Sequence, residues 1–289
     1  MGKKVCYCIL HYKNIEVTLN CIDSILKIND EFDTDIVVVD NGSKNGTGEI
    51  LKERYCNNKN VHCIINLDNL GFSKGNNIAY RYAKEELNDD AIIVMNSDMI
   101  IDNNFSSKFI QQKLCLSNAD VICPDIINKF DNHQNPLRVK RLDKNKYMFS
   151  IIKSAIIIFL ISIPVIGRSF CKKYLKRKNS KNIEKKELIE FDYNDFIPHG
   201  ACLVYTNRWV REKNIAFEPI TFMYCEEDIL YELIKRENYK LEFIPELKIK
   251  HLEDASLDFS YKDIVKRVRF RLFQQIKSIV SYLKYLRKN

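Results

Sequence analysis

The stretch AIIVMNSDMIIDNNF, residues 91–105, runs from apolar residues into an Asn-Ser-Asp triplet and then returns to apolar residues. A short apolar run bounded by turn-forming residues is typical of a buried β-strand. Because a buried strand has no use for a carboxylate, Asp98 is expected where this strand leaves the core. The stretch therefore predicts a strand whose carboxyl end presents polar side chains.

Apolar runs and helical periods alternate on the amino-terminal side of this stretch. KVCYCILHY (4–12), DIVVVD (35–40) and VHCIIN (61–66) predict three further strands. NIEVTLNCIDSILK, GEILKERYC and the segment that follows the NLGFSKG loop have the spacing of helices. Strands and helices that alternate with short connections predict parallel strands joined by crossover helices.

Length and composition set outer limits on the fold and the compartment. The chain has 289 residues, enough for one large α/β domain or one domain with an added module. The few glycines and prolines argue against a disordered or fibrous chain. Ten cysteines form no CxxC pair, which argues against a zinc ribbon, and several lie in apolar runs. We therefore expect reduced thiols and a cytoplasmic location.

The positive charge is local. Residues 138–186 contain fifteen Lys and Arg and two acids, a net charge of +13, which leaves −5 for the rest of a chain whose total is +8. A basic segment of this kind predicts a partner for one surface and not a general nucleic-acid binder.

Polar residues follow three of the predicted strands, as Leu10-His11-Tyr12, Asp40-Asn41-Gly42 and Asn96-Ser97-Asp98. Ligands of parallel sheets bind outside the carboxyl ends of the strands. Asp and Asn also follow strands as turn formers or helix caps, but three such ends together favour a binding site. The dinucleotide fingerprint GxGxxG does not follow the first strand, and GSKNGTG lacks the GK[ST] ending of a phosphate loop.

Six ordered motifs carry a resemblance to a known family: VVVDNGSKNGT, NLGFSKGNN, VMNSDM, HGACLVYTNR, FMYCEEDIL and IKHLEDAS. In this order they resemble the motifs of family 2 glycosyltransferases of the GT-A fold, most closely the rhamnosyltransferase-like branch of capsule and O-antigen biosynthesis. The resemblance covers residues 4–257 apart from the basic insertion. It implies an α/β fold with a Rossmann-like, mixed and mostly parallel sheet flanked by helices.

The resemblance also implies a set of donor-binding residues. Asp40 would hydrogen-bond the nucleotide base, the backbone at 10–12 would flank that base, and the 69–77 loop would reach the ribose or diphosphate. Gly200 would let the acceptor-side strand approach the donor sugar. His199 beside it departs from the family pattern. The residues implied for donor binding are Leu10, His11, Tyr12, Asp40, Asn41, Asn69, Gly71, Asn77, Asn96, Ser97 and Gly200.

The resemblance further implies a metal site and a base. A departing nucleotide diphosphate is stabilised by a divalent cation, and hard oxygen ligands suit Mn²⁺ or Mg²⁺. The DxD-type motif falls on residues 96–98, which makes Asp98 the expected metal carboxylate, and His251 is expected to complete the metal shell.

An inverting transfer needs a carboxylate that takes the proton of the acceptor hydroxyl. Glu227 is the expected base among the three acids 226–228, with Asp228 and then Glu226 as alternatives. The same acids could instead cap the helix that ILYELIKRENYK predicts, because a helix amino terminus favours negative charge. Asn238 replaces the family's usual glycine before Tyr239, in a turn where Asn tolerates the left-handed conformation.

Two segments predict surface contacts. SAIIIFLISIPVIG (154–167) is uncharged, too short to span a membrane, and flanked by basic clusters, which favours an interfacial helix on an anionic membrane over an ordinary buried helix. The carboxyl-terminal segment predicts a basic amphipathic helix that could lie on lipid, pack on the catalytic domain or form a homodimer. Its apolar positions are Val265, Val268, Leu272, Ile276, Ile279, Leu283 and Leu286.

These expectations divide the chain into a nucleotide-sugar-binding half (1–136), a basic helical insertion (137–190), an acceptor-binding and catalytic half (191–257) and the carboxyl-terminal helix (258–289). The expected activity is an inverting, metal-dependent transfer from a UDP- or dTDP-sugar to a glycan or polyprenyl-diphosphate-linked acceptor on the inner membrane face. A nucleotidyltransferase is the first alternative, but LHYKNIE lacks its Gly-rich loop. A non-enzymatic basic protein is the second, and it leaves the ordered acids unexplained.

Overall fold

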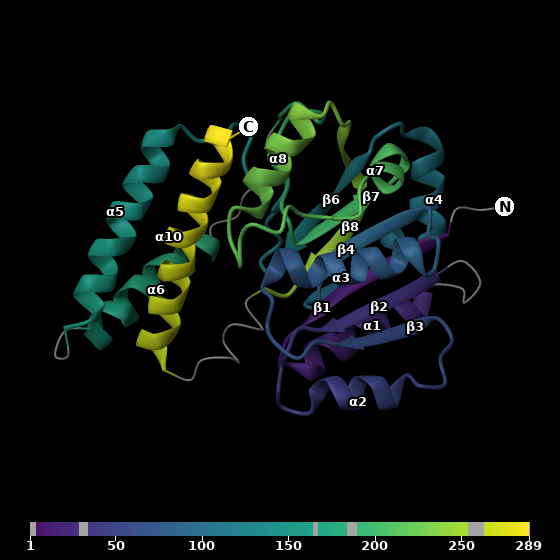
Figure 1. Cartoon of the computed structure of the whole chain (residues 1–289), viewed down its shortest axis with the longest axis horizontal. Coiled ribbons are helices and arrows are strands. Elements are labelled where there is room, and N and C mark those ends of the chain that lie inside the picture. Colours follow the sequence, from purple (N-terminus) through teal and green to yellow (C-terminus); the bar gives the residue numbers. More distant parts are fainter. Residues whose placement is uncertain (1–3, 29–33, 164–166, 184–189, 254–262, 289) are drawn as a thin grey trace.

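The computed structural model describes residues 4–28, 34–163, 167–183, 190–253 and 263–288, which build a mixed sheet flanked by helices (Figure 1). Its eight strands lie in the order β3-β2-β1-β4-β7-β6-β8-β5. The strands are β1 (Val5–His11), β2 (Thr34–Asp40), β3 (Val61–Ile65), β4 (Ala91–Asn96), β5 (Met99–Ile101), β6 (Val121–Asn128), β7 (Cys202–Tyr205) and β8 (Leu241–His251).

The helices confirm the periods that the sequence predicts between and after these strands. They are α1 (Ile15–Ile28), α2 (Thr47–Arg54), α3 (Phe72–Glu85), α4 (Ser107–Leu116), α5 (Lys144–Ile161), α6 (Gly167–Ile183), α7 (Asn207–Glu212), α8 (Glu226–Arg236) and α10 (Ile264–Lys288), with a 3-10 turn η1 (Asn103–Phe105). The predicted α/β class is therefore confirmed.

The sheet has an apolar core on each face, because alternate residues of a strand point in opposite directions. Tyr7 of β1 packs with Ile22 of α1 on one face, and Cys8 packs with Tyr80 of α3 on the other. Strands buried on both faces read as continuous apolar runs. Polar side chains of the central strands therefore gather at the strand ends.

The chain order reverses at β1, which has β2 on one side and β4 on the other, both parallel to it. The register pairs His11 with Asp40 and Leu10 with Asn96. The three polar strand ends that the sequence predicts are therefore neighbours at one edge. In open α/β sheets the ligand crevice lies at such a switch point, outside the carboxyl ends of the strands.

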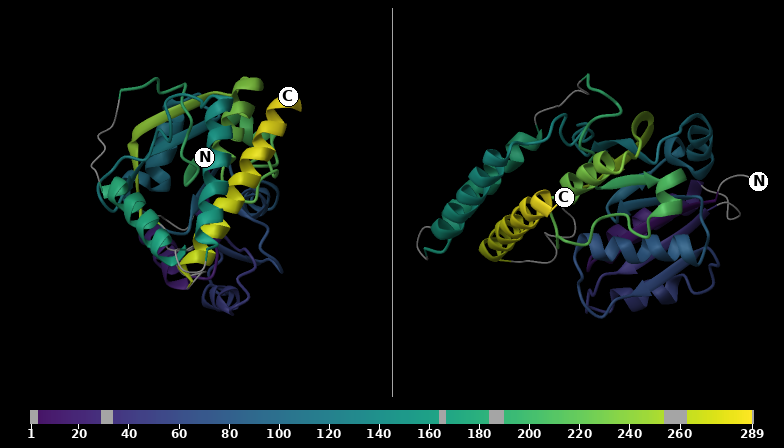
Figure 2. Two further views of the ribbon diagram at one scale, coloured as in Figure 1. Left: turned by 90° about the vertical axis from the view of Figure 1, so that its left-hand side faces the viewer. Right: turned by 45° about the horizontal axis from the view of Figure 1, so that its top comes forward.

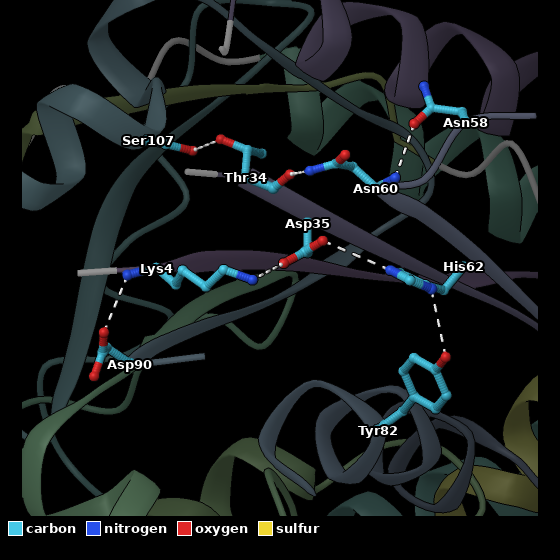
Figure 3. Close-up of polar contacts among 9 residues, drawn as sticks. All are labelled: Lys4, Thr34, Asp35, Asn58, Asn60, His62, Tyr82, Asp90 and Ser107. Carbon is cyan, nitrogen blue, oxygen red and sulfur yellow. Dashed lines mark hydrogen bonds and ion pairs between the residues drawn. The ribbon is translucent and has the colours of Figure 1, made fainter. Parts of the chain in front are cut away.

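A polar network closes the opposite edge, at the amino ends of β1, β2 and β3 (Figure 3). Lys4 Nζ lies 3.1 Å from Asp35 Oδ2, and His62 Nε2 lies 3.6 Å from the other oxygen of the same carboxylate. The hydroxyl of Tyr82 on α3 lies 3.4 Å from His62 Nδ1. This network ties strands to a helix and engages the polar groups of this edge with one another.

Helices α5, α6 and α10 form a separate layer beside the sheet, here called the helical lobe (Figures 1 and 2). Two apolar clusters hold it together. In one, Ile157 of α5 packs with Leu272 of α10. In the other, Tyr147 of α5 and Tyr282 of α10 pack with Ile229 of α8, which joins the lobe to the sheet domain. None of the helices within the described residues has the length and apolar character needed to cross a membrane.

The lobe differs from the sequence expectation in two details. Helix α5 begins ten residues before the uncharged stretch, at Lys144, and ends at Ile161. The apolar side of α10 is covered within this chain, because Val268, Leu272 and Ile279 pack against the other lobe helices or α8. A homodimer through α10 would therefore have to use its other faces.

Candidate active site

The donor-side strand ends are held by their own side chains. The imidazole of His11 is fully buried between the hydroxyls of Thr18, at 2.7 Å, and Thr47, at 2.9 Å. Burial lowers the pKa of His11 to about 4, so the ring is neutral at pH 7. Its backbone carbonyl accepts a hydrogen bond from the Asn41 N–H at 3.0 Å. The His11 side chain is thus a structural group, and Leu10 and Tyr12 on either side are only partly buried.

Asp40 and Asn41 shape the first loop of the site. The Asp40 carboxylate is buried and accepts hydrogen bonds from the Ser43 N–H and hydroxyl. The Asn41 amide donates to Asn69 Oδ1 and to the Gly71 carbonyl, both at 3.1 Å. Asp40 therefore orders the turn after β2, and Asn41 fastens the 69–71 loop beside it.

The 69–77 segment joins the amino-terminal half of the sheet domain to the 216–222 segment. Gly71 has a φ of 81°, and a Cβ there would lie 2.4 Å from the Phe222 carbonyl oxygen, so a side chain does not fit. The Asn77 amide oxygen accepts the N–H groups of Ala216 and Phe217, and its nitrogen donates to the Phe217 carbonyl. The Asn77 amide thus holds the backbone of residues 216 and 217, and its contact with the donor stays a prediction.

Asp98 and His251 lie side by side. Ser97 and Asp98 form the turn between β4 and β5, and the register of β5 with β8 pairs Met99 with His251. Asp98 Oδ1 lies 3.2 Å from His251 Nε2, and both side chains are buried. Asn96 lies at the end of β4, and its backbone N–H donates a hydrogen bond to the Ala201 carbonyl. The two residues predicted to hold a metal are therefore in contact.

Gln134 determines which ring nitrogen of His251 carries the proton. The Gln134 amide nitrogen donates to Glu253 Oε1 at 2.5 Å, which leaves its oxygen to face His251 Nδ1 at 2.7 Å. That nitrogen must therefore carry a hydrogen. In neutral His251 the lone pair of Nε2 then faces the Asp98 carboxylate, so two acceptors meet. A proton or a bound cation between them relieves this repulsion, so the pair fits a metal ion.

The acids 226–228 begin α8, directly after two residues in the left-handed conformation, Tyr224 with φ 76° and Cys225 with φ 67°. Non-glycine residues in this region are strained, and such strain gathers at functional sites. Glu226 is buried and accepts a hydrogen bond from the Thr221 hydroxyl at 3.0 Å. Burial, with Glu227 beside it, raises the pKa of Glu226 to about 8.

The Asp228 carboxylate binds two side chains of the segment that leads into the lobe. This carboxylate is buried, forms an ion pair with the Arg138 guanidinium and accepts a hydrogen bond from the Tyr147 hydroxyl at 2.6 Å. Burial lowers the pKa of Arg138, but the ion pair and hydrogen bond between Arg138 and Asp228 outweigh it and raise that pKa. A buried carboxylate with these partners is held as a charged anchor.

Glu227 lies between Glu226 and Asp228 in the sequence, and its side chain contacts Gly200. Its Oε1 is so close to Gly200 that a Cβ there would lie 2.9 Å away, which explains the glycine. Burial raises the pKa of Glu227, while the backbone amides of its own helix end and of Gly200 lower it. As a residue Glu227 is partly exposed, whereas Glu226 and Asp228 are buried. Of the three acids, Glu227 is the accessible one.

His199 connects the base candidate to the metal candidates. It precedes Gly200, its N–H donates to Asn135 Oδ1 at 2.7 Å, and its ring centroid lies 6.0 Å from that of His251. Burial, and secondarily His251, lower the pKa of His199 to about 3, so the ring is neutral. The structure thus brings Glu227, Gly200, His251 and Asp98 into one region.

Several site residues escape the sequence motifs. Gln134, Arg138 and Tyr147 come from the segment after β6, where the sequence shows only basic character. A hydrogen-bond partner far away in sequence has no local pattern that would reveal it. Asp254 and Ser256, which end the last motif, lie outside the described residues.

Comparisons with known proteins bear on the family and the fold of the chain. The chain is 31% identical over 123 residues to the low-salt glycan biosynthesis hexosyltransferase Agl10 of Haloferax volcanii, covering 42% of this chain and 36% of that relative. The match thus spans about a third of the relative's length.

One solved structure shares the architecture over nearly the whole chain. S. aureus TarS 1-349 superposes with a TM-score of 0.51 and 13% identity, over 99% of this chain and 73% of TarS. The same TarS fragment in complex with UDP-GlcNAc gives a TM-score of 0.36 and 21% identity, over 43% of this chain and 35% of that one. The first superposition confirms the GT-A type of sheet.

The family assignment rests on a longer match. Residues 6–212 match the sequence profile of the family described as "Glycosyl transferase family 2". This match excludes the two alternatives, a nucleotidyltransferase and a non-enzymatic basic protein. The chain belongs to glycosyl transferase family 2 and has the GT-A fold.

Proposed function

We propose that this glycosyltransferase moves a sugar, with inversion at the anomeric carbon, from a UDP- or dTDP-sugar to a hydroxyl of a glycan acceptor. The observation that carries the proposal is the different surroundings of the three acids. Asp228 is bound to Arg138 and Tyr147, and Glu226 is buried on Thr221. Glu227 is the partly exposed one of the three and its carboxylate lies against Gly200, which leaves it as the base.

The reaction needs one proton transfer and one exchange of bonds. The Glu227 carboxylate accepts the proton of the acceptor hydroxyl, whose oxygen bonds to the anomeric carbon. The bond from that carbon to the donor diphosphate breaks, and the nucleoside diphosphate leaves with the electron pair. The raised pKa of Glu227 makes it a stronger base than an exposed glutamate.

Asp98 and His251 are proposed to hold Mn²⁺ or Mg²⁺. Within the described residues no group of three or more His, Cys, Asp and Glu side chains gathers as a metal cage. An oxygen and a nitrogen ligand still fit, because Mg²⁺ is commonly held by one or two carboxylates together with substrate phosphates. The bound cation would neutralise charge on the leaving diphosphate. Gln134 then keeps the Nε2 lone pair of His251 available.

The acceptor is proposed to be a polyprenyl-diphosphate-linked glycan, used in capsule or O-antigen assembly at the cytoplasmic face of the membrane. The basic segment 138–186 supports a site next to anionic lipid. All ten cysteines are free, as a reducing compartment requires.

Donor turnover tests the proposal. Purified protein is incubated with UDP-, dTDP- and GDP-sugars, UDP-GlcNAc included, in Mn²⁺ or in EDTA, and nucleotide release is measured. We expect slow hydrolysis of one donor that stops in EDTA and in Asp98→Ala. Turnover that is equal in EDTA, or equal in Asp98→Ala, would overturn the metal-dependent reading.

A further inference from the structure

Helix α5 carries an apolar face that no described part of this chain covers. Phe149 and Phe159 are 67% and 70% exposed, and large apolar neighbours on the same face are about half exposed. At about 100° per residue the exposed positions span roughly 120° of the helix surface. They are Met148, Phe149, Ile152, Ala155, Ile156 and Phe159, here called the outer face.

The opposite face of α5 is fully used inside the protein. Tyr147, Ser154, Ile157 and Ile161 are buried against the rest of the lobe and α8. The lobe lies beside the sheet domain (Figure 2), and the face of α5 that packs on α10 and α8 is the one opposite the outer face. The exposed apolar residues are therefore not left over from an incomplete core.

The charge around the outer face has one sign. Lys144, Lys146 and Lys153 are exposed and lie at the borders of the apolar arc. Lys172 and Lys173 are exposed on neighbouring α6, where Arg168 pairs with Asp263 at 3.5 Å. Residues 144–183 contain ten Lys and Arg and neither Asp nor Glu. Long basic side chains can extend to the headgroups while an apolar strip between them enters the acyl boundary.

We infer that the outer face of α5 is a docking surface for an anionic phospholipid bilayer. A nucleic acid does not fit this surface, because protein surfaces that bind nucleic acid are polar and positively charged, whereas the outer face is apolar. A second copy meeting the same face would bring two all-basic borders together. An anionic bilayer satisfies both the apolar strip and the basic borders. The inference goes beyond the proposed transfer and does not depend on the donor or on Glu227.

Vesicle flotation without substrate tests the inference. The full chain is mixed with vesicles of equal parts phosphatidylglycerol and phosphatidylcholine, and with pure phosphatidylcholine vesicles. The test variant is Phe149→Glu with Phe159→Glu. The matched control is Leu116→Glu on α4, because Leu116 is 85% exposed but lies outside the lobe. Circular dichroism and the thermal midpoint verify that each variant folds.

We expect the protein and the control to float with the anionic vesicles and less with the neutral ones. The double variant should need about tenfold or more lipid for half-binding. Equal flotation of the double variant, or no flotation of the protein, would overturn the inference. A dimer in sedimentation that the double variant dissolves, without vesicle binding, would assign the face to self-association and overturn it as well.

Discussion

Glu226, Glu227 and Asp228 are neighbours in sequence, but protein atoms surround each of them differently. A further buried carboxyl, that of Asp89, lies elsewhere in the molecule. Asp89, between α3 and β4, is buried, and neither of its oxygens has an N–H or O–H partner among the described residues. Burial, with Asp35 nearby, raises the pKa of Asp89 to about 7.

Asp89 makes stability depend on pH. The folded protein keeps the proton up to about pH 7, whereas the unfolded chain loses it near the ordinary value of 3.8. The stabilisation is therefore complete below that ordinary value and is lost as the pH rises through about 7. Asp89→Asn should be more stable than the parent at pH 8, by up to about 4 kcal/mol, with the gap closing toward pH 4.

Urea unfolding at a series of pH values measures this difference. The matched control is Asp90→Asn, because Asp90 is the exposed neighbour that accepts the Lys4 N–H. A constant gap between Asp89→Asn and the parent across the series would show that Asp89 does not titrate in this range.

Gln134 is the residue whose role is most easily separated from folding. Gln134→Leu removes the acceptor that fixes the His251 ring, so we expect about a tenfold to hundredfold rise in the Mn²⁺ concentration for half-maximal donor turnover. Turnover at saturating Mn²⁺ should recover much of the lost rate. Gln112→Leu on α4 is the exposed control. An unchanged Mn²⁺ dependence in Gln134→Leu would contradict this role.

The sequence predicts which strand ends lie together but not the hydrogen-bond partners of each side chain. Residues 11, 40 and 96 could be placed together because parallel strands end at one edge. The side chains of His11 and Asn77 are bonded to protein groups that the sequence does not reveal. Such hydrogen bonds join residues far apart in sequence, so periodicity and spacing carry no sign of them.

At the scale of elements, apolar runs predict the central strands accurately because both faces of β1 and β2 are buried. The turn at Asn238 is also confirmed, with a φ of 60°. The start of α5 was missed, because the uncharged run suggested a helix from residue 154. The helix begins at Lys144 since its buried face, from Tyr147 to Ile161, continues through the charged part of the segment.

The link between the lobe and α8 predicts graded effects on stability. Arg138→Leu leaves the buried Asp228 carboxylate without its ion-pair partner, which should lower the free energy of unfolding by about 3 kcal/mol. Tyr147→Phe removes one hydrogen bond from the same carboxylate and should lower it by about 1 kcal/mol.

Arg141→Leu is the control for this pair, since Arg141 meets Glu232 with more solvent around both side chains. Its effect should stay below about 1 kcal/mol. Urea midpoints give the order of the three variants. An Arg138→Leu protein as stable as Arg141→Leu would show that Asp228 is not a charged anchor.

At the scale of the whole molecule, the sheet, the 69–77 segment and the lobe all converge on the edge that carries Asp98 and Glu227. Phe72 N–H donates to the Phe222 carbonyl at 2.6 Å, so the loop beside the donor strand ends is tied to the segment that leads into α8. A donor bound at this edge would contact both halves of the sheet domain and should stabilise them together.

Donor and metal should therefore raise the thermal midpoint cooperatively. A ligand present at a hundred times its dissociation constant stabilises the folded state by about 2.7 kcal/mol, which corresponds to roughly 5 °C or more for a chain of this size. The shift with the nucleoside diphosphate of the turned-over donor and Mn²⁺ should vanish in EDTA and in Asp98→Ala. A shift of the same size without metal would contradict the assignment of Asp98 and His251.

The most direct test of the account compares two adjacent acids. Glu227→Gln should reduce donor turnover by about a hundredfold or more while the donor dissociation constant, measured by calorimetry, stays nearly unchanged. Glu226→Gln should retain most of the turnover at pH 7, because a pKa of about 8 already keeps Glu226 neutral there. Full turnover in Glu227→Gln, or a loss confined to Glu226→Gln, would contradict Glu227 as the base.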